Sequence, residues 1–105
     1  MNVTHKIIWI TGASSGIGEA LVHECAKHQT KLILSARREE ELKRVAKQAK
    51  LKEDDYLIIP FDLADTSKAK EYAQQIIQKF GTIDILINNG GQSQRSEANN
   101  TTNET

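Results

Sequence analysis

The chain has 105 residues, enough for one small domain with a modest core but few for a complete α/β enzyme. Its 14 basic and 14 acidic side chains give no net charge, and a surface without a basic stripe excludes nucleic acid and anionic membranes as expected partners. The longest apolar runs have the length of strands, which excludes a membrane span, and the first residues lack a signal-peptide pattern, so we expect a cytoplasmic protein.

Strand and helix patterns alternate along the chain. Continuous apolar runs predict strands, buried on both faces, at residues 5–11, 31–36, 56–59 and 83–88. Helical periodicity predicts helices at residues 16–28, at 39–50, and from a cap at Asp65 or Thr66 to a stop at Gly81. This order predicts a Rossmann-type half of a three-layer α/β fold, with four parallel strands in the order 3-2-1-4. We expect residues 1–96 to form this unit and the polar residues 97–105 to form a frayed helix start or a disordered tail.

Each predicted helix has one apolar stripe that should face the sheet. The stripes comprise Ile17, Ala20, Leu21 and Cys25 in the first helix, Leu42, Val45, Ala46 and Ala49 in the second, and Ala69, Tyr72, Ala73, Ile76, Ile77 and Phe80 in the third. The charged face of the second helix is interpreted as solvated. Cys25 is expected to be a buried thiol rather than a nucleophile, and His23 and His28 have no partners at metal-ligand spacing.

Residues 11–18 (TGASSGIG), here called the glycine turn, join the first strand to the first helix. Gly12 and Gly16 remove Cβ atoms that would hold a pyrophosphate away from the backbone. The free N–H groups of the first helical turn then face the anion. Gly18 allows the helix to pack closely on the strand, and further donors or a helix cap can come from Ser14 and Ser15. The spacing excludes a P-loop of the NTPase type, and a plain strand-to-helix turn remains the alternative.

Two further motifs follow later strands: Asp62-Leu63 and Asn88-Asn89-Gly90-Gly91. With the glycine turn, in this order and spacing, they make the chain similar to the short-chain dehydrogenase/reductase family over most of its length. Residues 88–96 further resemble the branch called dehydrogenase/reductase family member 7. The resemblance implies that Asp62 and Leu63 approach the adenine, that Asn89 and Gly90 line the adenosine ribose, and that Asn88 braces the sheet. Gly90 stands where the family usually has Ala, and a turn or cap role for Asp62 stays open.

Arg37 and Arg38 bear on which cofactor is expected. NAD-selective Rossmann units place an acid about 20 residues after the glycines, where it holds the ribose 2′-hydroxyl. The two guanidiniums found here would instead attract a 2′-phosphate, through charge-assisted hydrogen bonds of about 1.5–3 kcal/mol each. We therefore expect NADP(H) rather than NAD(H); alternatively, both arginines are ordinary helix-entry charges balanced by Glu39, Glu40 and Glu41. The expected cofactor-binding set is Gly12, Ser14, Ser15, Gly16, Ile17, Gly18, Arg37, Arg38, Asp62, Leu63, Asn89 and Gly90.

Catalysis in the family requires a Tyr, a Lys four residues later and a Ser that holds the substrate oxygen. The tyrosines of this chain, Tyr56 and Tyr72, are followed at that distance by Pro60 and Ile76. Ser93 and Ser96 lie too early in the chain to match the catalytic Ser. We therefore assign no catalytic residue.

The resemblance implies the NADP(H)-binding part of a short-chain oxidoreductase that acts on an alcohol or carbonyl, with the catalytic half absent from this chain. A bare apolar edge is expected on the last strand, at Ile83, Ile85, Leu86 and Ile87, and it would favour pairing with another chain. The alternatives are a non-catalytic truncated isoform, which serves as a nucleotide-binding or dimerisation module, and an unstable product without function.

Overall fold

The computed structural model of the chain describes residues 3–14, 16–62 and 67–89. The elements, in chain order, are β1 (Ile7–Thr11), α1 (Gly16–Ala26), β2 (Lys31–Ser35), α2 (Glu39–Gln48), the short 3-10 helix η1 (Glu53–Asp55), β3 (Tyr56–Ile58), α3 (Ala69–Phe80) and β4 (Ile85–Asn88). Every predicted strand and helix is present, with bounds at or a few residues inside the predicted ones. The predicted tail, 97–105, lies outside the described residues.

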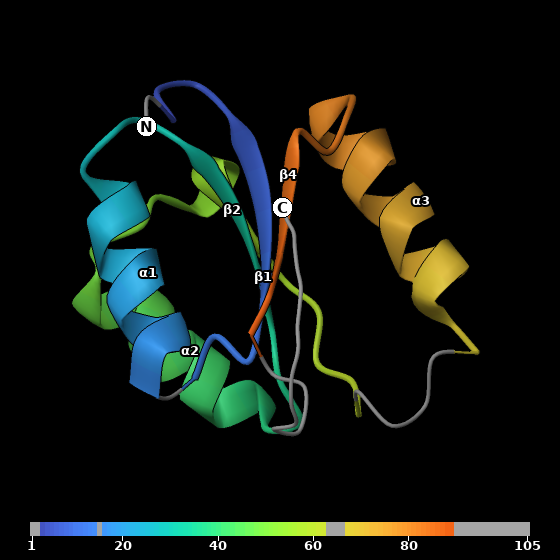
Figure 1. Ribbon diagram of the computed structural model, residues 1–105, viewed down its shortest axis with the longest axis horizontal. Coiled ribbons are helices and arrows are strands. Elements are labelled where there is room, and N and C mark those ends of the chain that lie inside the picture. Colours follow the sequence, from blue (N-terminus) through green and yellow to red (C-terminus); the bar gives the residue numbers. More distant parts are fainter. Residues whose placement is uncertain (1–2, 15, 63–66, 90–105) are drawn as a thin grey trace.

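The four strands form one sheet in the order β3-β2-β1-β4. All three pairings are parallel, and the central Trp9 of β1 lies opposite Ile33 of β2 and Leu86 of β4. Figure 1 shows the sheet as the middle of three layers, with α1 and α2 on one face and α3 on the other. The strand order and the layers confirm the Rossmann-type prediction.

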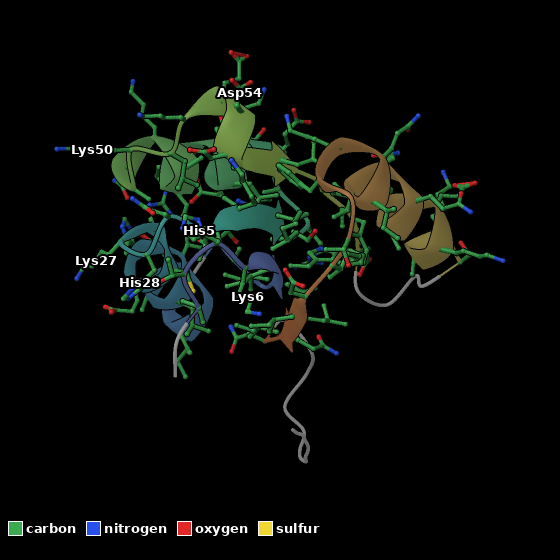
Figure 2. The ribbon with its side chains drawn as sticks, turned by 90° about the horizontal axis from the view of Figure 1, so that it is seen from above. His5, Lys6, Lys27, His28, Lys50 and Asp54 are labelled. Atoms are coloured by element: carbon green, nitrogen blue, oxygen red, sulfur yellow. The ribbon has the colours of Figure 1, made fainter. Side chains whose placement is uncertain are left out.

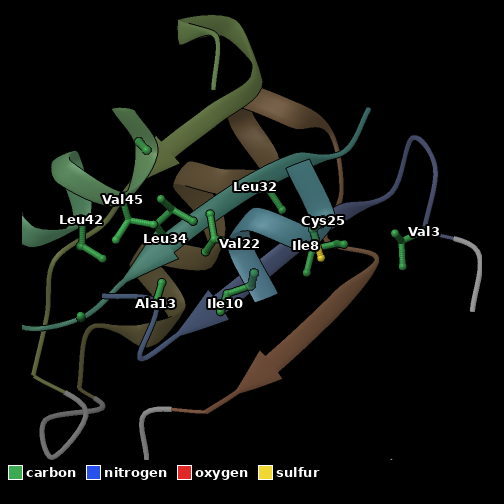
Figure 3. Packing of buried hydrophobic residues seen from close by; sticks show 12 residues of the cluster. Val3, Ile8, Ile10, Ala13, Val22, Cys25, Leu32, Leu34, Leu42 and Val45 are labelled. Atoms are coloured by element: carbon green, nitrogen blue, oxygen red, sulfur yellow. The ribbon is translucent and has the colours of Figure 1, made fainter. Parts of the chain in front are cut away.

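Buried side chains cover both faces of the two central strands, as their continuous apolar runs predict. Toward α1 and α2 the core contains Ile8, Ile10, Leu32 and Leu34 from the sheet and Val22, Cys25, Leu42 and Val45 from the helices (Figure 3). Toward α3 it contains Ile7, Trp9, Ile33, Ile59 and Ile76. The indole N–H of Trp9 donates to the Ser35 hydroxyl at 2.8 Å, so this buried polar pair is satisfied.

The predicted inward stripe of α1 is partly wrong. Ile17 is 70% exposed and Ala20 is also exposed, whereas Leu21 packs against the core. The buried positions of α1 are Gly18, Val22 and Cys25. The stripe therefore begins at a glycine, which an analysis of apolar side chains passes over, and Ile17 lies about 100° away from it around the helix.

The prediction for α3 is wrong at Ile77, which is 48% exposed. Its neighbour Ile76 is fully buried. Because the side chains of successive helical residues point about 100° apart, they cannot both face the sheet, and that of Ile77 points away from it. The predicted caps Asp65 and Thr66 lie outside the described residues, and the helix begins after Lys68, which makes no side-chain cap hydrogen bond. Gly81 ends α3 as predicted, with φ 95°.

Cys25 is buried, as the sequence predicts, and burial raises the pKa of its thiol. This group is therefore an apolar packing element rather than a thiolate. His23 and His28 are half-buried and lie beside Glu19 and Glu24 of their own helix. The described residues contain neither a helix long and apolar enough to cross a membrane nor a cluster of three potential metal ligands.

Candidate functional site

The carboxyl ends of the four parallel strands meet at one edge of the sheet, here called the carboxyl edge, which is the lower end in Figure 1. The Ala13 N–H donates to the Ser35 carbonyl at 3.1 Å, which joins the glycine turn to the end of β2, two residues before Arg37. The Phe61 N–H donates to the Ala36 carbonyl at 2.9 Å and so brings the segment of Asp62 beside that of Arg37. Three of the sequence motifs therefore converge here.

The backbone of the glycine turn adopts a left-handed conformation at two of its glycines. Gly12 and Gly16 have φ of 66° and 57°, in the left-handed region. A Cβ built on Gly18 would lie 1.8 Å from the Gly12 carbonyl oxygen and 2.9 Å from Nδ2 of Asn89. The close approach predicted for Gly18 is present, and its partner is the Gly12 carbonyl rather than the strand beneath.

A cradle of bare backbone lies at the start of α1. A Cβ built on Gly16 would meet nothing within 4 Å, and the Ile17 side chain beside it is exposed. The free N–H groups of a helix N-terminus favour an anion, and an exposed apolar side chain beside them favours a ligand with an apolar part. This surface fits a dinucleotide, which has both. The exposure of Ile17 contradicts its predicted packing role, and its place in the predicted cofactor-binding set stays a prediction.

Thr11 connects β1 to the end of β4. Its hydroxyl donates to Oδ1 of Asn88 at 2.9 Å and accepts the backbone N–H of Asn89 at 3.1 Å. Asn88 thus has the bracing position that the resemblance implies. Asn89 is held between Thr11 and Gly18, at the rim of the glycine turn. The other predicted residues Ser15, Leu63 and Gly90 lie outside the described part of the chain.

Arg37 and Arg38 are exposed at the entry of α2, and Arg38 occupies its N-cap position. The acids that follow have other partners: Glu39 pairs with Lys43 at 3.1 Å, and Glu41 pairs with Arg44 at 2.9 Å. Within residues 3–14, 16–62 and 67–89, neither Arg37 nor Arg38 forms an ion pair. Two of the three acids that could have balanced these arginines are therefore engaged elsewhere.

Arg44 is the residue of this region that sequence reasoning missed. From α2 it donates through Nη2 to the Ser14 carbonyl at 3.1 Å and binds both Glu19 carboxylate oxygens at 3.3 Å. These hydrogen bonds hold the pKa of the Glu19 carboxyl below its usual range. The only sequence signal was an acid three residues earlier, Glu41, which predicts a pair within α2 and not a contact with α1.

The two tyrosines, Tyr56 and Tyr72, pack against the hydrophobic core. Tyr56 packs half-buried against the core beneath α1 and α2. Tyr72 lies on α3, with its ring centroid 5.1 Å from that of Phe61. Both tyrosines have the packing roles that the sequence predicts.

Comparison with known proteins agrees with this geometry. Residues 6–105 match the family model described as short chain dehydrogenase. Dehydrogenase/reductase SDR family member 7 of Mus musculus is 50% identical over 98 residues, which cover 90% of this chain and 29% of that protein. The apo form of glucose dehydrogenase of Caenorhabditis elegans matches with TM-score 0.77 at 31% identity, over 89% of this chain and 40% of that one.

A metagenomic short-chain oxidoreductase, solved in complex with NADP, matches with TM-score 0.72 at 23% identity, over 82% of this chain and 39% of that one. At this identity the match concerns the fold alone. The chain spans less than half the length of each of these relatives.

Proposed function

This chain belongs to the short-chain dehydrogenase family, and from that premise we propose that its carboxyl edge binds NADP(H) as the nucleotide-binding part of an oxidoreductase. Members of this family bind a nicotinamide dinucleotide. Because the chain spans 29% of its mouse relative, the reaction of a whole protein is part of the proposal: hydride moves between the cofactor and an alcohol or carbonyl. When bound, the nicotinamide supplies or accepts the hydride, and the protein supplies position and electrostatics.

The observation on which this proposal depends is the placement of Arg37 and Arg38. Both are exposed and without ion pairs among the described residues, and the Ala13–Ser35 hydrogen bond fixes their segment beside the glycine turn. A pyrophosphate at the turn would therefore have two guanidiniums one strand away, where a ribose 2′-phosphate lies in a Rossmann unit. An acid at this position would repel that phosphate.

The other roles follow the same arrangement. The bare backbone at Gly12 and Gly16 and the start of α1 would hold the pyrophosphate. The sequence motifs assign Asp62 and Asn89 to the adenosine half. Asp62 follows β3 and Asn89 follows β4, and these two strands lie on opposite sides of β1, which leads into the glycine turn. Ser15, Leu63 and Gly90 enter the proposal from the sequence motifs alone.

The test is a titration of the full 105-residue chain with NADPH and with NADH, followed by fluorescence. We expect wild type to prefer NADPH, and Arg37→Ala to lose about tenfold in NADPH affinity and little in NADH affinity, because one charge-assisted contact is removed. Lys47→Ala is the matched control, since it removes an exposed cation from the far end of α2. Equal wild-type affinities for the two cofactors would overturn the NADP(H) preference.

A second candidate function is pairing with another chain, and it is favoured by the exposure of Leu86. This side chain is 57% exposed on β4, which in the described part of the chain pairs with β1 alone. An apolar strand at the edge of a sheet is a template for further pairing. Sedimentation at rising concentration separates the two readings, because nucleotide binding needs no change in mass and a dimerisation module doubles it.

A further inference from the structure

Arg44 connects the second helix to the glycine turn. Its guanidinium reaches two elements at once: the Ser14 carbonyl within the turn, and both carboxylate oxygens of Glu19 in the first turns of α1. It also binds Glu41 and Gln48 on its own helix, at 3.0 Å each. A planar fork of five N–H donors can serve such divergent acceptors, and a single ammonium cannot.

The Ser14 carbonyl lies between Gly12 and Gly16, which have φ of 66° and 57°. A glycine can change its backbone conformation more easily than other residues because it has no Cβ. Ala13 is fixed by its hydrogen bond to Ser35, and Gly18 is fixed by its close contact with Gly12. Arg44 supplies a side-chain contact between these two points, and so it orders the turn before a ligand arrives.

Glu19 presents an electrostatic difficulty for an anion at this turn. Its carboxylate lies three residues after Gly16, close to the helix N-terminus where a pyrophosphate would bind. The fork from Arg44 compensates that charge, at 3.3 Å to each oxygen, and it also offsets the negative end of the Ser14 carbonyl dipole. Without Arg44, a phosphate would approach an uncompensated carboxylate.

We propose that Arg44 is a positioning residue of the dinucleotide site, which holds the Ser14 carbonyl and neutralises Glu19 so that the glycine turn accepts a pyrophosphate. This inference rests on the function proposed above. Arg44 is proposed to act on the binding of the pyrophosphate, which NADPH and NADH share, whereas Arg37 is proposed to bind the 2′-phosphate, which only NADPH has. Loss of Arg44 should therefore lower the affinity for both cofactors, and loss of Arg37 the affinity for NADPH alone.

The experiment titrates NADPH and NADH into wild type, Arg44→Ala, Arg44→Ala with Glu19→Gln, and Lys43→Ala. We expect Arg44→Ala to lower the affinity for NADPH and for NADH by a similar factor, about tenfold. Adding Glu19→Gln should restore affinity to within about threefold of wild type, because the uncompensated carboxylate is gone. Lys43→Ala is the control, since it removes the neighbouring cation and its pair with Glu39 without touching the turn.

Thermal unfolding of each variant separates positioning from folding. If Arg44 had only a structural role, the double variant would bind the cofactors no more tightly than Arg44→Ala. The loss of affinity in each variant would then parallel the fall in its midpoint of thermal unfolding. That result would overturn the proposal, and so would an Arg44→Ala variant that binds both cofactors as tightly as wild type does. If Arg44→Ala does not fold, Arg44→Lys keeps the charge but not the fork, and unchanged affinities in it would overturn the proposal equally. A wild type that binds neither cofactor would instead reject the proposed function.

Discussion

A left-handed backbone occurs at both ends of the sheet, but among the described residues only the amino end has ordinary side chains in this conformation. There His5, Gln29 and Lys50 have φ of 64°, 57° and 59°, beside Gly81 with φ 95°; His5 and Lys50 are labelled in Figure 2. At the carboxyl edge, Gly12 and Gly16 have φ of 66° and 57°. A left-handed φ costs an ordinary residue roughly 1–2 kcal/mol and is therefore tolerated. What distinguishes the carboxyl edge is the need to keep its backbone bare.

Charge shows the same contrast between the two ends. Several basic residues lie at the amino end (Figure 2), and of these Lys27 and His28 each have a side-chain nitrogen 3.5 Å from a Glu24 carboxylate oxygen. Arg37 and Arg38 at the carboxyl edge are without ion pairs among the described residues. Positive charge is therefore present at both ends, but only one end combines it with open backbone and a helix N-terminus.

The largest effect is expected for Gly18→Ala. The new Cβ would lie 1.8 Å from the Gly12 oxygen, a backbone atom that cannot turn aside, so α1 or the glycine turn has to move. We expect a loss of about 3 kcal/mol in the free energy of unfolding, measured by urea titration, together with loss of NADPH binding. Gly81→Ala is the control: its Cβ would meet nothing within 4 Å, so it should cost only about 1 kcal/mol of backbone strain and spare binding. Equal costs for the two would contradict the role of the close contact.

Gly16→Ala separates folding from binding at the same turn. Its Cβ would enter open space, so the cost in stability is the strain of φ 57°, roughly 1–2 kcal/mol. The methyl group would nevertheless stand where a phosphate approaches, and we expect NADPH affinity to fall by roughly tenfold or more. The reverse change, Gln29→Gly at the amino end, should shift stability by less than about 1 kcal/mol and leave binding unchanged. Full NADPH binding by Gly16→Ala would remove the turn from the site.

The sequence predicted the framework of the molecule because its signals there are local. Apolar runs located the strands, the alternation of elements gave the order β3-β2-β1-β4, and Gly81 located the end of α3. The predicted inward face of α1 was wrong at Ile17 because the buried position beside it is Gly18, which has no side chain that a hydrophobic periodicity could detect. The phase of α3 failed at Ile77, where two adjacent isoleucines offer alternative stripes.

Long-range polar contacts were beyond sequence reasoning for a different reason. Arg44 reaches Glu19 only because α1 and α2 lie side by side on one face of the sheet (Figure 1). Asp84 accepts the Ile7 N–H at 2.9 Å, which no spacing could indicate across 77 residues of separation. The candidate site was therefore predictable as a set of motifs, whereas the contacts that hold those motifs in place depend on tertiary packing.

The smallest expected effects compare the two acids of α1 that have ion-pair partners, one near each end of the sheet. The pKa of each carboxyl is below the ordinary value of 4.5, through hydrogen bonds from Arg44 for Glu19 and through attraction to Lys27 for Glu24. A lowered pKa means that each contribution to stability is present above that value and is lost as the pH falls through the folded-state pKa. Because the Glu19 pair joins two helices and the Glu24 pair is exposed within one, Glu19→Gln should destabilise the protein more at pH 7 than Glu24→Gln.

Both differences from wild type should shrink as the pH falls below the ordinary value of 4.5 and through the lower folded-state pKa of each carboxyl, where the wild-type carboxyls become protonated. Urea titrations across this range measure them. Equal losses at pH 7 would mean that the Arg44 link adds no more stability than a surface pair, and its role would then be confined to ordering the glycine turn for its ligand.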